Sequence, residues 1–108
     1  MEPSDVVIVL TTLPAGTDAG AFARSLVDEH LAACVSVSGE MRSVYRWESR
    51  VTEDAERQVI IKTTASCVQD LQARLTILHP YSVPEFIVLT AADGSADYLA
   101  WVRQSVVP

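Results

Sequence analysis

The sequence predicts an α+β fold in which the elements follow the order β-α-β-β-α-β, with a short helix at the C-terminal end. Two observations support this prediction. The spacing of the apolar residues switches between a period of two and a helical period along the chain. The length of 108 residues suits a single domain, residues 1–108, and 49% of the residues are apolar, which provides a core and argues against disorder.

The first half of the chain predicts a strand, a helix and a long second strand. Residues 6–12 are a continuous, mostly β-branched run, which indicates a central strand buried on both faces. Apolar residues at helical spacing predict a helix from about residue 18 to about residue 33, with His30 near its end. From Cys34 to Glu48 the period is two, and Gly39 marks a bulge or bend. One face of this strand is expected to carry Val35, Val37, Met41, Tyr45 and Trp47.

The second half predicts a return strand, a helix, a fourth strand and a final helix. Residues 49–56 form a polar connection without glycine, so a tight primed hairpin turn is not expected, and its charged residues, Glu56 included, are interpreted as a solvated hairpin tip. A strand over 57–64 and a helix from Ser66 to just before Pro80 follow. After a rigid connector with two prolines come a strand over 85–90 and a short helix capped by Ser95.

This order is the split-βαβ pattern of ferredoxin-like folds, with an antiparallel sheet and both main helices on one face. The other face has little left to cover it, yet the first strand is apolar on both sides: Val6, Ile8 and Leu10 face one way, and Val7 and Val9 the other. Because soluble monomers avoid large exposed apolar patches, we expect a closed oligomer in which the long hairpin reaches a neighbouring subunit.

Charge and composition exclude several classes of partner. The net charge of −6 argues against nucleic acid and anionic membranes, which need a basic surface, and makes cations the more natural small partners. The longest apolar runs are far shorter than the roughly 20 residues of a membrane helix, so no membrane insertion is expected. The N-terminus has no signal-peptide pattern, which favours the cytoplasm, where Cys34 and Cys67 would stay as thiols.

The candidate site residues lie in three segments. His79, Tyr81 and Glu85 surround two prolines that stiffen the backbone, so they could hold a cation, with imidazole suited to copper, or they could simply shape a corner between helix and strand. Tyr45 and Trp47 suit either an interface or core packing. Lys62, on a strand expected to be central, needs a partner or a wet cleft.

Five segments together resemble the CutA family of divalent-cation-tolerance proteins over essentially the whole chain. These segments are Leu31–Val35, Ser43–Glu48, Ile60–Thr63, His79–Glu85 and Asp97–Trp101. The resemblance implies a ferredoxin-like protomer in a tight homotrimer similar to the PII signalling proteins. It also implies clefts between subunits, lined by Lys62, His79, Tyr81, Glu85, Trp47 and Tyr45.

The resemblance further implies a role in the response to metal ions, with Cu²⁺ or another divalent cation bound at His79 and no catalytic activity. The chain departs from the family's copper pattern, which uses a cysteine on the first strand and two adjacent histidines before the proline. Thr11 and Leu78 occupy two of those positions, so only His79 remains.

Two other functions stay open beside metal tolerance. One is a PII-like signalling or scaffold trimer that binds a small anion or metabolite at Lys62 in the cleft between subunits. The other is an enzyme that uses Lys62, His79 and Glu85 as acid–base groups, although no nucleophile or cofactor motif accompanies them.

Overall fold

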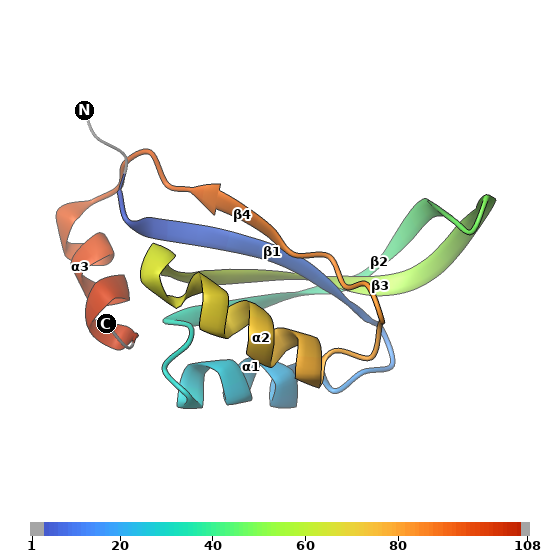
Figure 1. Cartoon of the computed structure of the whole chain (residues 1–108), viewed down its shortest axis with the longest axis horizontal. Coiled ribbons are helices and arrows are strands. Elements are labelled where there is room, and N and C mark those ends of the chain that lie inside the picture. Colours follow the sequence, from blue (N-terminus) through green and yellow to red (C-terminus); the bar gives the residue numbers. More distant parts are fainter. Residues whose placement is uncertain (1–3, 107–108) are drawn as a thin grey trace.

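A computed structural model describes residues 4–106 of the chain and confirms the predicted order of elements (Figure 1). A short 3-10 turn, Ala65–Cys67, precedes the second helix. The elements are β1 (Val6–Pro14), α1 (Ala19–Asp28), β2 (Cys34–Trp47), β3 (Arg50–Thr64), α2 (Val68–Leu78), β4 (Ile87–Thr90) and α3 (Ala96–Ser105). None of the helices within these described residues is long and apolar enough to span a membrane.

The four strands form one antiparallel sheet in the order β2-β3-β1-β4, which is the ferredoxin-like arrangement. β1 lies between β3 and β4, as its continuous apolar run predicts. α1 and α2 lie side by side under one face of the sheet (Figure 1). The core between these layers includes Val9, Ile61, Leu26 and Leu75, all 0% exposed. Alternate strand residues therefore face the two helices and close the core.

The opposite face of the sheet, which we call the open face, is apolar but only partly covered. Ile87 pairs with Leu10 and Leu89 pairs with Ile8, so all four side chains lie on this face. Ile87 and Leu89 are 48% and 47% exposed. This confirms that the strands carry apolar surface on both sides and that the two main helices cover only one of them.

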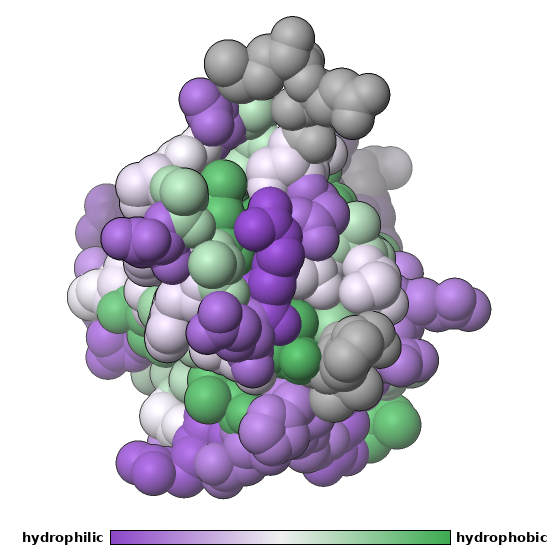
Figure 2. All heavy atoms as spheres, turned by 90° about the vertical axis from the view of Figure 1, so that its left-hand side faces the viewer, coloured by the Kyte–Doolittle hydropathy of each residue, from purple (hydrophilic) through white to green (hydrophobic). Residues whose placement is uncertain are grey.

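α3 covers one end of the sheet rather than the whole open face. Val102 and Val106 pack with Val6 in a second, smaller core cluster. Figure 2 views the molecule from this end and shows small apolar groups interspersed with polar residues, not one continuous apolar surface. The ion pair between Arg103 and Asp5, 2.7 Å, joins α3 to the start of β1. The large remaining apolar area of the sheet therefore lies away from α3.

A β-bulge in β2 reverses the faces of the hairpin and corrects the predicted strand pattern. Val37 pairs with Val59, but Glu40 pairs with Arg57, so two residues of β2 lie opposite one residue of β3. Val35 and Val37 thus face the helices, whereas Met41, Tyr45 and Trp47 lie on the side of the open face. The prediction that all five share one face was wrong because the extra residue changes the alternation by one.

The turn of the hairpin also differs from the prediction. Trp47 pairs with Arg50, and the two residues between them, Glu48 and Ser49, have φ values of 50° and 66°. Two consecutive left-handed residues are the conformation of a primed two-residue turn, whose twist matches that of the strands. All of the expected polar connection over 49–56 except the turn residue Ser49 is therefore strand, and β2 and β3 form a continuous hairpin that projects beyond the rest of the domain (Figure 1).

α1 is shorter than predicted. It ends at Asp28, and His30 lies in the following turn with a φ of 60°. The backbone N–H groups of His30 and Leu31 bond back to carbonyls of Val27 and Leu26, which closes the helix end. His30 is therefore an exposed turn residue, not a helical one.

Candidate functional site

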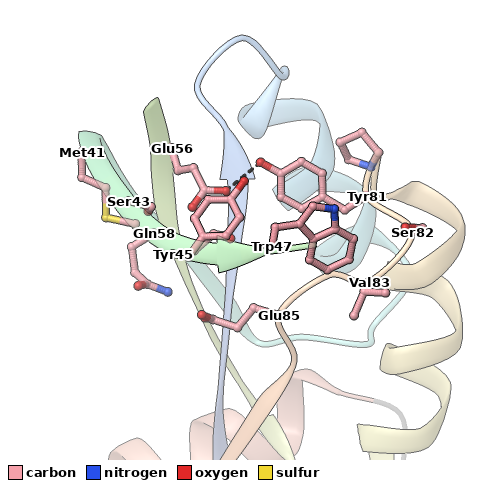
Figure 3. Close-up of a pocket in the computed structure, with 12 residues that line it drawn as sticks. Met41, Ser43, Tyr45, Trp47, Glu56, Gln58, Tyr81, Ser82, Val83 and Glu85 are labelled. Atoms are coloured by element: carbon pink, nitrogen blue, oxygen red, sulfur yellow. Dashed lines mark hydrogen bonds between the residues drawn. The ribbon is translucent and has the colours of Figure 1, made fainter. Parts of the chain in front are cut away.

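A pocket of about 640 Å³ lies between the base of the hairpin and the connector from α2 to β4. We call it the hairpin pocket (Figure 3). Three segments supply its walls: β2, β3 with the adjacent part of β1, and the connector. The lining residues are Thr12, Met41, Ser43, Tyr45, Trp47, Glu56, Gln58, Pro80, Tyr81, Ser82, Val83 and Glu85.

The bulge and the prolines together bring the aromatic rings into the pocket. Because the bulge reverses the hairpin, Tyr45 and Trp47 turn toward the same side as Glu56. Pro80 and Pro84 restrict the connector backbone, which places Tyr81 and Glu85 on the opposite wall. Figure 3 shows the three rings and the two carboxyl groups around one space.

His79 supports the pocket from beneath and does not line it. Its side chain is only 6% exposed. Its Nε2 lies 2.6 Å from the carbonyl oxygen of Thr12, and its Nδ1 accepts a 3.1 Å bond from the backbone N–H of Tyr81. A carbonyl only accepts and a backbone N–H only donates, so Nε2 is the donor to Thr12 and Nδ1 is the acceptor from Tyr81. Both ring nitrogens are occupied, which leaves no lone pair for a metal ion in this arrangement.

Two tyrosines donate hydrogen bonds to carboxylates at the pocket. The hydroxyl of Tyr81 donates to Oε2 of Glu56 at 2.7 Å, and that of Tyr45 donates to Asp54. Burial, together with the bond to Glu56, raises the pKa of the Tyr81 phenol far above its usual value. The hydrogen bond to Asp54 raises the pKa of Tyr45. Both phenols therefore remain protonated donors at neutral pH.

Glu56 is the residue that sequence reasoning missed. It was interpreted as part of a solvated hairpin tip, yet it is only 5% exposed. The available signal was its spacing, because Glu56, Gln58 and Ile60 alternate along one face of the same strand. The strand continues through Glu56, and the fold buries its carboxyl group beneath Tyr81.

Lys62 lies at the other end of the open face. It pairs with Ile8 and Cys34, and its Nζ donates to the hydroxyl of Tyr98 at 3.1 Å. That hydrogen bond raises the pKa of Lys62. Six residues of extended strand separate it from Glu56, about 20 Å. A single protomer thus brings Tyr45, Trp47, Tyr81 and Glu85 together, keeps His79 beneath them, and leaves Lys62 apart.

Apart from the thioether sulfur of Met41, the groups at the pocket that could ligate a metal ion are oxygen atoms. Within residues 4–106 no three His, Cys, Asp or Glu side chains come together as a metal site. The sulfur of Cys34 lies 3.7 Å from the hydroxyl of Ser36, in the part of β2 that pairs with Lys62. Thr11, at the family's cysteine position, has a buried hydroxyl oxygen without a hydrogen-bond partner and does not line the pocket. Copper's preferred imidazole and thiolate ligands therefore do not meet in one protomer.

Comparison with known proteins places this geometry in a family. Residues 7–105 match the family described as CutA1 divalent ion tolerance protein. The chain is 42% identical over 98 residues to the divalent-cation tolerance protein CutA of Thermus thermophilus, covering 91% of this chain and 95% of that one. It is 39% identical over 102 residues to the protein of the same name from Pectobacterium atrosepticum, covering 94% and 93%. A solved structure of the divalent cation tolerance protein from T. thermophilus superposes with a TM-score of 0.91 at 40% identity, covering 94% and 99%.

Proposed function

Because the chain belongs to the CutA1 divalent-ion tolerance family, we propose that it works as a homotrimer that binds divalent metal ions, such as copper, in the response to metal ions. The observation that carries the proposal is the open face, on which Ile87 and Leu89 remain almost half exposed in the isolated protomer. Burial of that face between subunits would remove apolar surface that a monomer would leave in water.

A neighbouring subunit would also complete the cleft. Lys62 and the hairpin pocket lie at opposite ends of the open face, so a single chain cannot bring them together. In a closed ring, the hairpin of one subunit would reach the neighbour and place the two ends side by side. The proposed cleft residues are therefore Lys62 from one subunit with His79, Tyr81, Glu85, Trp47 and Tyr45 from the next.

Metal binding in this proposal uses carboxylates rather than His79. Glu56 and Glu85 line the pocket, and the net charge of −6 adds to the attraction for cations. His79 stays in its two hydrogen bonds and orients the connector. With the carboxylate oxygens as ligands, we expect weak binding of Cu²⁺ and also binding of harder divalent ions.

The anion-binding and enzymatic alternatives receive less support. Among the described residues that line the pocket there is no lysine or arginine to attract an anion. Lys62, the residue on which the anion hypothesis depends, donates to Tyr98 in its own chain. For acid–base catalysis His79 would have to break one of its two hydrogen bonds. The proposal accordingly includes no catalytic activity, and it keeps the cytoplasm as the expected compartment.

Light scattering coupled to size exclusion tests the assembly. The wild type should elute as a trimer, and Leu89→Asp on the open face should shift it toward monomer. Glu53→Asp, an exposed change on the hairpin, should leave the trimer intact. A folded wild-type monomer at micromolar concentration would contradict the proposal.

Calorimetric titration tests the metal site. Cu²⁺ and Mg²⁺ should bind the wild type weakly, and Glu85→Gln should reduce binding of both several-fold. Glu53→Gln serves as the matched control, because Glu53 pairs with Arg42 outside the pocket. Loss of Cu²⁺ binding in a folded His79→Gln variant, with unchanged binding in Glu85→Gln, would instead identify His79 as the metal ligand.

A further inference from the structure

Opposite charges lie at opposite ends of one row of side chains on the open face. Along β3, alternate residues from Lys62 to Glu56 point to this face, with Ile60 and Gln58 between them. Glu85 lines the hairpin pocket together with Glu56, so the row is basic at one end and acidic at the other. The two ends are about 20 Å apart, which keeps them from meeting within one chain.

This polarity of the open face suits a closed ring of identical subunits. In such a ring every contact is heterologous, so one end of the face on each subunit meets the other end of the face on the next. Each contact then brings the ammonium group of Lys62 next to the carboxylates of Glu56 and Glu85. Complementary charges of this kind fix the register of an interface and exclude wrong pairings.

The helix α3 holds the Lys62 side chain at its end of the open face. Its Nζ donates to the hydroxyl of Tyr98 at 3.1 Å and lies 5.4 Å from the centre of that ring. The Tyr98 ring in turn packs against Trp101, with the ring centroids 5.5 Å apart. An ammonium group has three donors, so two of them remain for carboxylate oxygens. The bond to Tyr98 also raises the pKa of Lys62, which favours its charged form.

The acidic end of the row can accept one cation at a time. Glu56 is 5% exposed, and the hydroxyl of Tyr81 donates to its Oε2, which fixes this carboxylate in place. A buried carboxylate is costly without a counter-ion, so the assembled protein favours an ammonium group beside it. A divalent ion would use the same oxygens, and two cations in one pocket repel each other. Binding of either cation therefore opposes binding of the other.

We propose that the partner subunit's Lys62 is the counter-ion of the hairpin pocket and that a divalent ion displaces it on binding. This inference rests on the proposed function, because it needs both the ring and the carboxylate site. It gives a regulatory role to Lys62, the only lysine in the sequence. The ammonium group lowers the affinity of the pocket for metal ions, and a bound metal ion removes one attractive contact between subunits.

Carbodiimide cross-linking of the full-length wild-type oligomer tests the ion pair. The reagent joins an amine to a carboxyl group where the two are in contact, and mass spectrometry identifies the joined peptides. We expect a link from Lys62 to Glu56 or Glu85, and it must join two chains because the ends of one row lie about 20 Å apart. Saturating Mg²⁺ should reduce the yield several-fold, whereas Na⁺ at equal ionic strength should not. Absence of the link in the trimer, or an unchanged yield when Mg²⁺ is bound, would overturn the inference.

Calorimetry of a lysine variant tests the competition. Lys62→Met keeps most of the side chain but removes its charge, so it should bind Mg²⁺ and Cu²⁺ about three- to tenfold more tightly than the wild type. Arg24→Met is the matched control, because Arg24 is an exposed residue of α1 and its loss changes the net charge equally. Equal affinities in the two variants would overturn the inference. If light scattering shows that Lys62→Met does not form a trimer, the effect of Mg²⁺ on the wild-type cross-link decides.

The two experiments separate this inference from the proposed function. If Mg²⁺ and Cu²⁺ bind the trimer but the cross-link does not form, the lysine counter-ion fails and metal binding stands. If the cross-link forms and neither metal ion binds the wild type or Lys62→Met, the lysine counter-ion stands and the metal-binding function fails.

Discussion

The two faces of the same sheet differ in how much of their apolar surface the protomer buries. On the helix-covered face, Val9 and Ile61 are 0% exposed. On the open face, Ile87 and Leu89 remain nearly half exposed, although their strands are equally apolar. Since neighbouring residues of one strand face opposite ways, a single run such as β1 serves both faces. The helix-covered face stabilises the protomer, and the open face provides the surface that we propose for assembly and, at one end, the hairpin pocket.

The largest expected effect is a loss of unfolding free energy, and its dependence on protein concentration should differ between the two faces. Leu75→Ala, in the core under the sheet, should lower the free energy of unfolding by about 2–5 kcal/mol at every protein concentration. Ile87→Ala, on the open face, should lower it by an amount that shrinks on dilution, because only the proposed assembly covers the exposed half of that side chain. Urea unfolding at two concentrations a hundredfold apart checks this. Equal concentration dependence of the two variants would contradict the distinction.

The next effect concerns the bulge. Deletion of Gly39 removes the extra residue of β2, so the tip of the hairpin should turn Tyr45 and Trp47 away from the pocket. We expect a loss of about 1–3 kcal/mol in unfolding free energy and a changed environment of Trp47, measured by its fluorescence in a Trp101→Phe background.

Gly39→Ala is the control for that deletion. No atom lies within 4 Å of a Cβ placed at this position, and its φ is not positive. The bulge therefore does not need glycine itself, and the substitution should change stability by less than about 0.5 kcal/mol. A large loss in Gly39→Ala would show that the residue type, and not the extra residue, determines the geometry.

A smaller effect is the pH dependence of folding stability that Tyr81 contributes at the pocket end of the open face. The pKa of Tyr81 is raised above its ordinary value of 10.0, so the folded state holds this proton more tightly than the unfolded state. The resulting stabilisation is complete below the unfolded-state pKa and is lost as the pH rises beyond it. Unfolding at about pH 8 and about pH 11 should show a smaller drop in Tyr81→Phe than in the wild type. Identical drops would contradict the assignment.

The smallest effect is expected on the outer surface of the helix layer. Arg74 of α2 pairs with Glu29, which follows α1, at 2.9 Å, and both side chains are more than a third exposed. An exposed pair of this kind contributes about 0–1 kcal/mol. Glu29→Gln should therefore lower the unfolding free energy by less than about 1 kcal/mol, and less still in high salt. Salt-independent loss would indicate a packing effect instead.

The elements could be predicted from the sequence more completely than the site. The continuous run of β1 and the change of period at Cys34 predict the sheet and its uncovered face, because these depend on local patterns. Tyr45 and Trp47 were placed on the wrong side because the alternation of a strand does not show how many residues a bulge contains. Glu56 was missed because its burial depends on Tyr81, which is distant in the sequence.

The residues around His79 illustrate the same limit. Their spacing predicts a rigid corner and, as an alternative, a cation site; the structure shows the corner, and the cation site stays a proposal. The corner belongs to His79, whose ring bonds to Thr12 and to the backbone of Tyr81. The carboxyl groups that line the hairpin pocket are Glu85 of this segment and Glu56, which lies on β3, far from this segment in the sequence.

The extra residue in β2 has a consequence for relatives and designs with hairpins of other lengths. Between the bulge and the turn, each added or removed pair of residues per strand preserves which side chains face the pocket, whereas a single one exchanges the two sets. The parity of this segment, and not its length, is therefore the quantity to compare between sequences. Two homologues with different hairpin lengths but the same parity should present equivalent pockets, and an alignment gap of one residue there should signal a change of ligand.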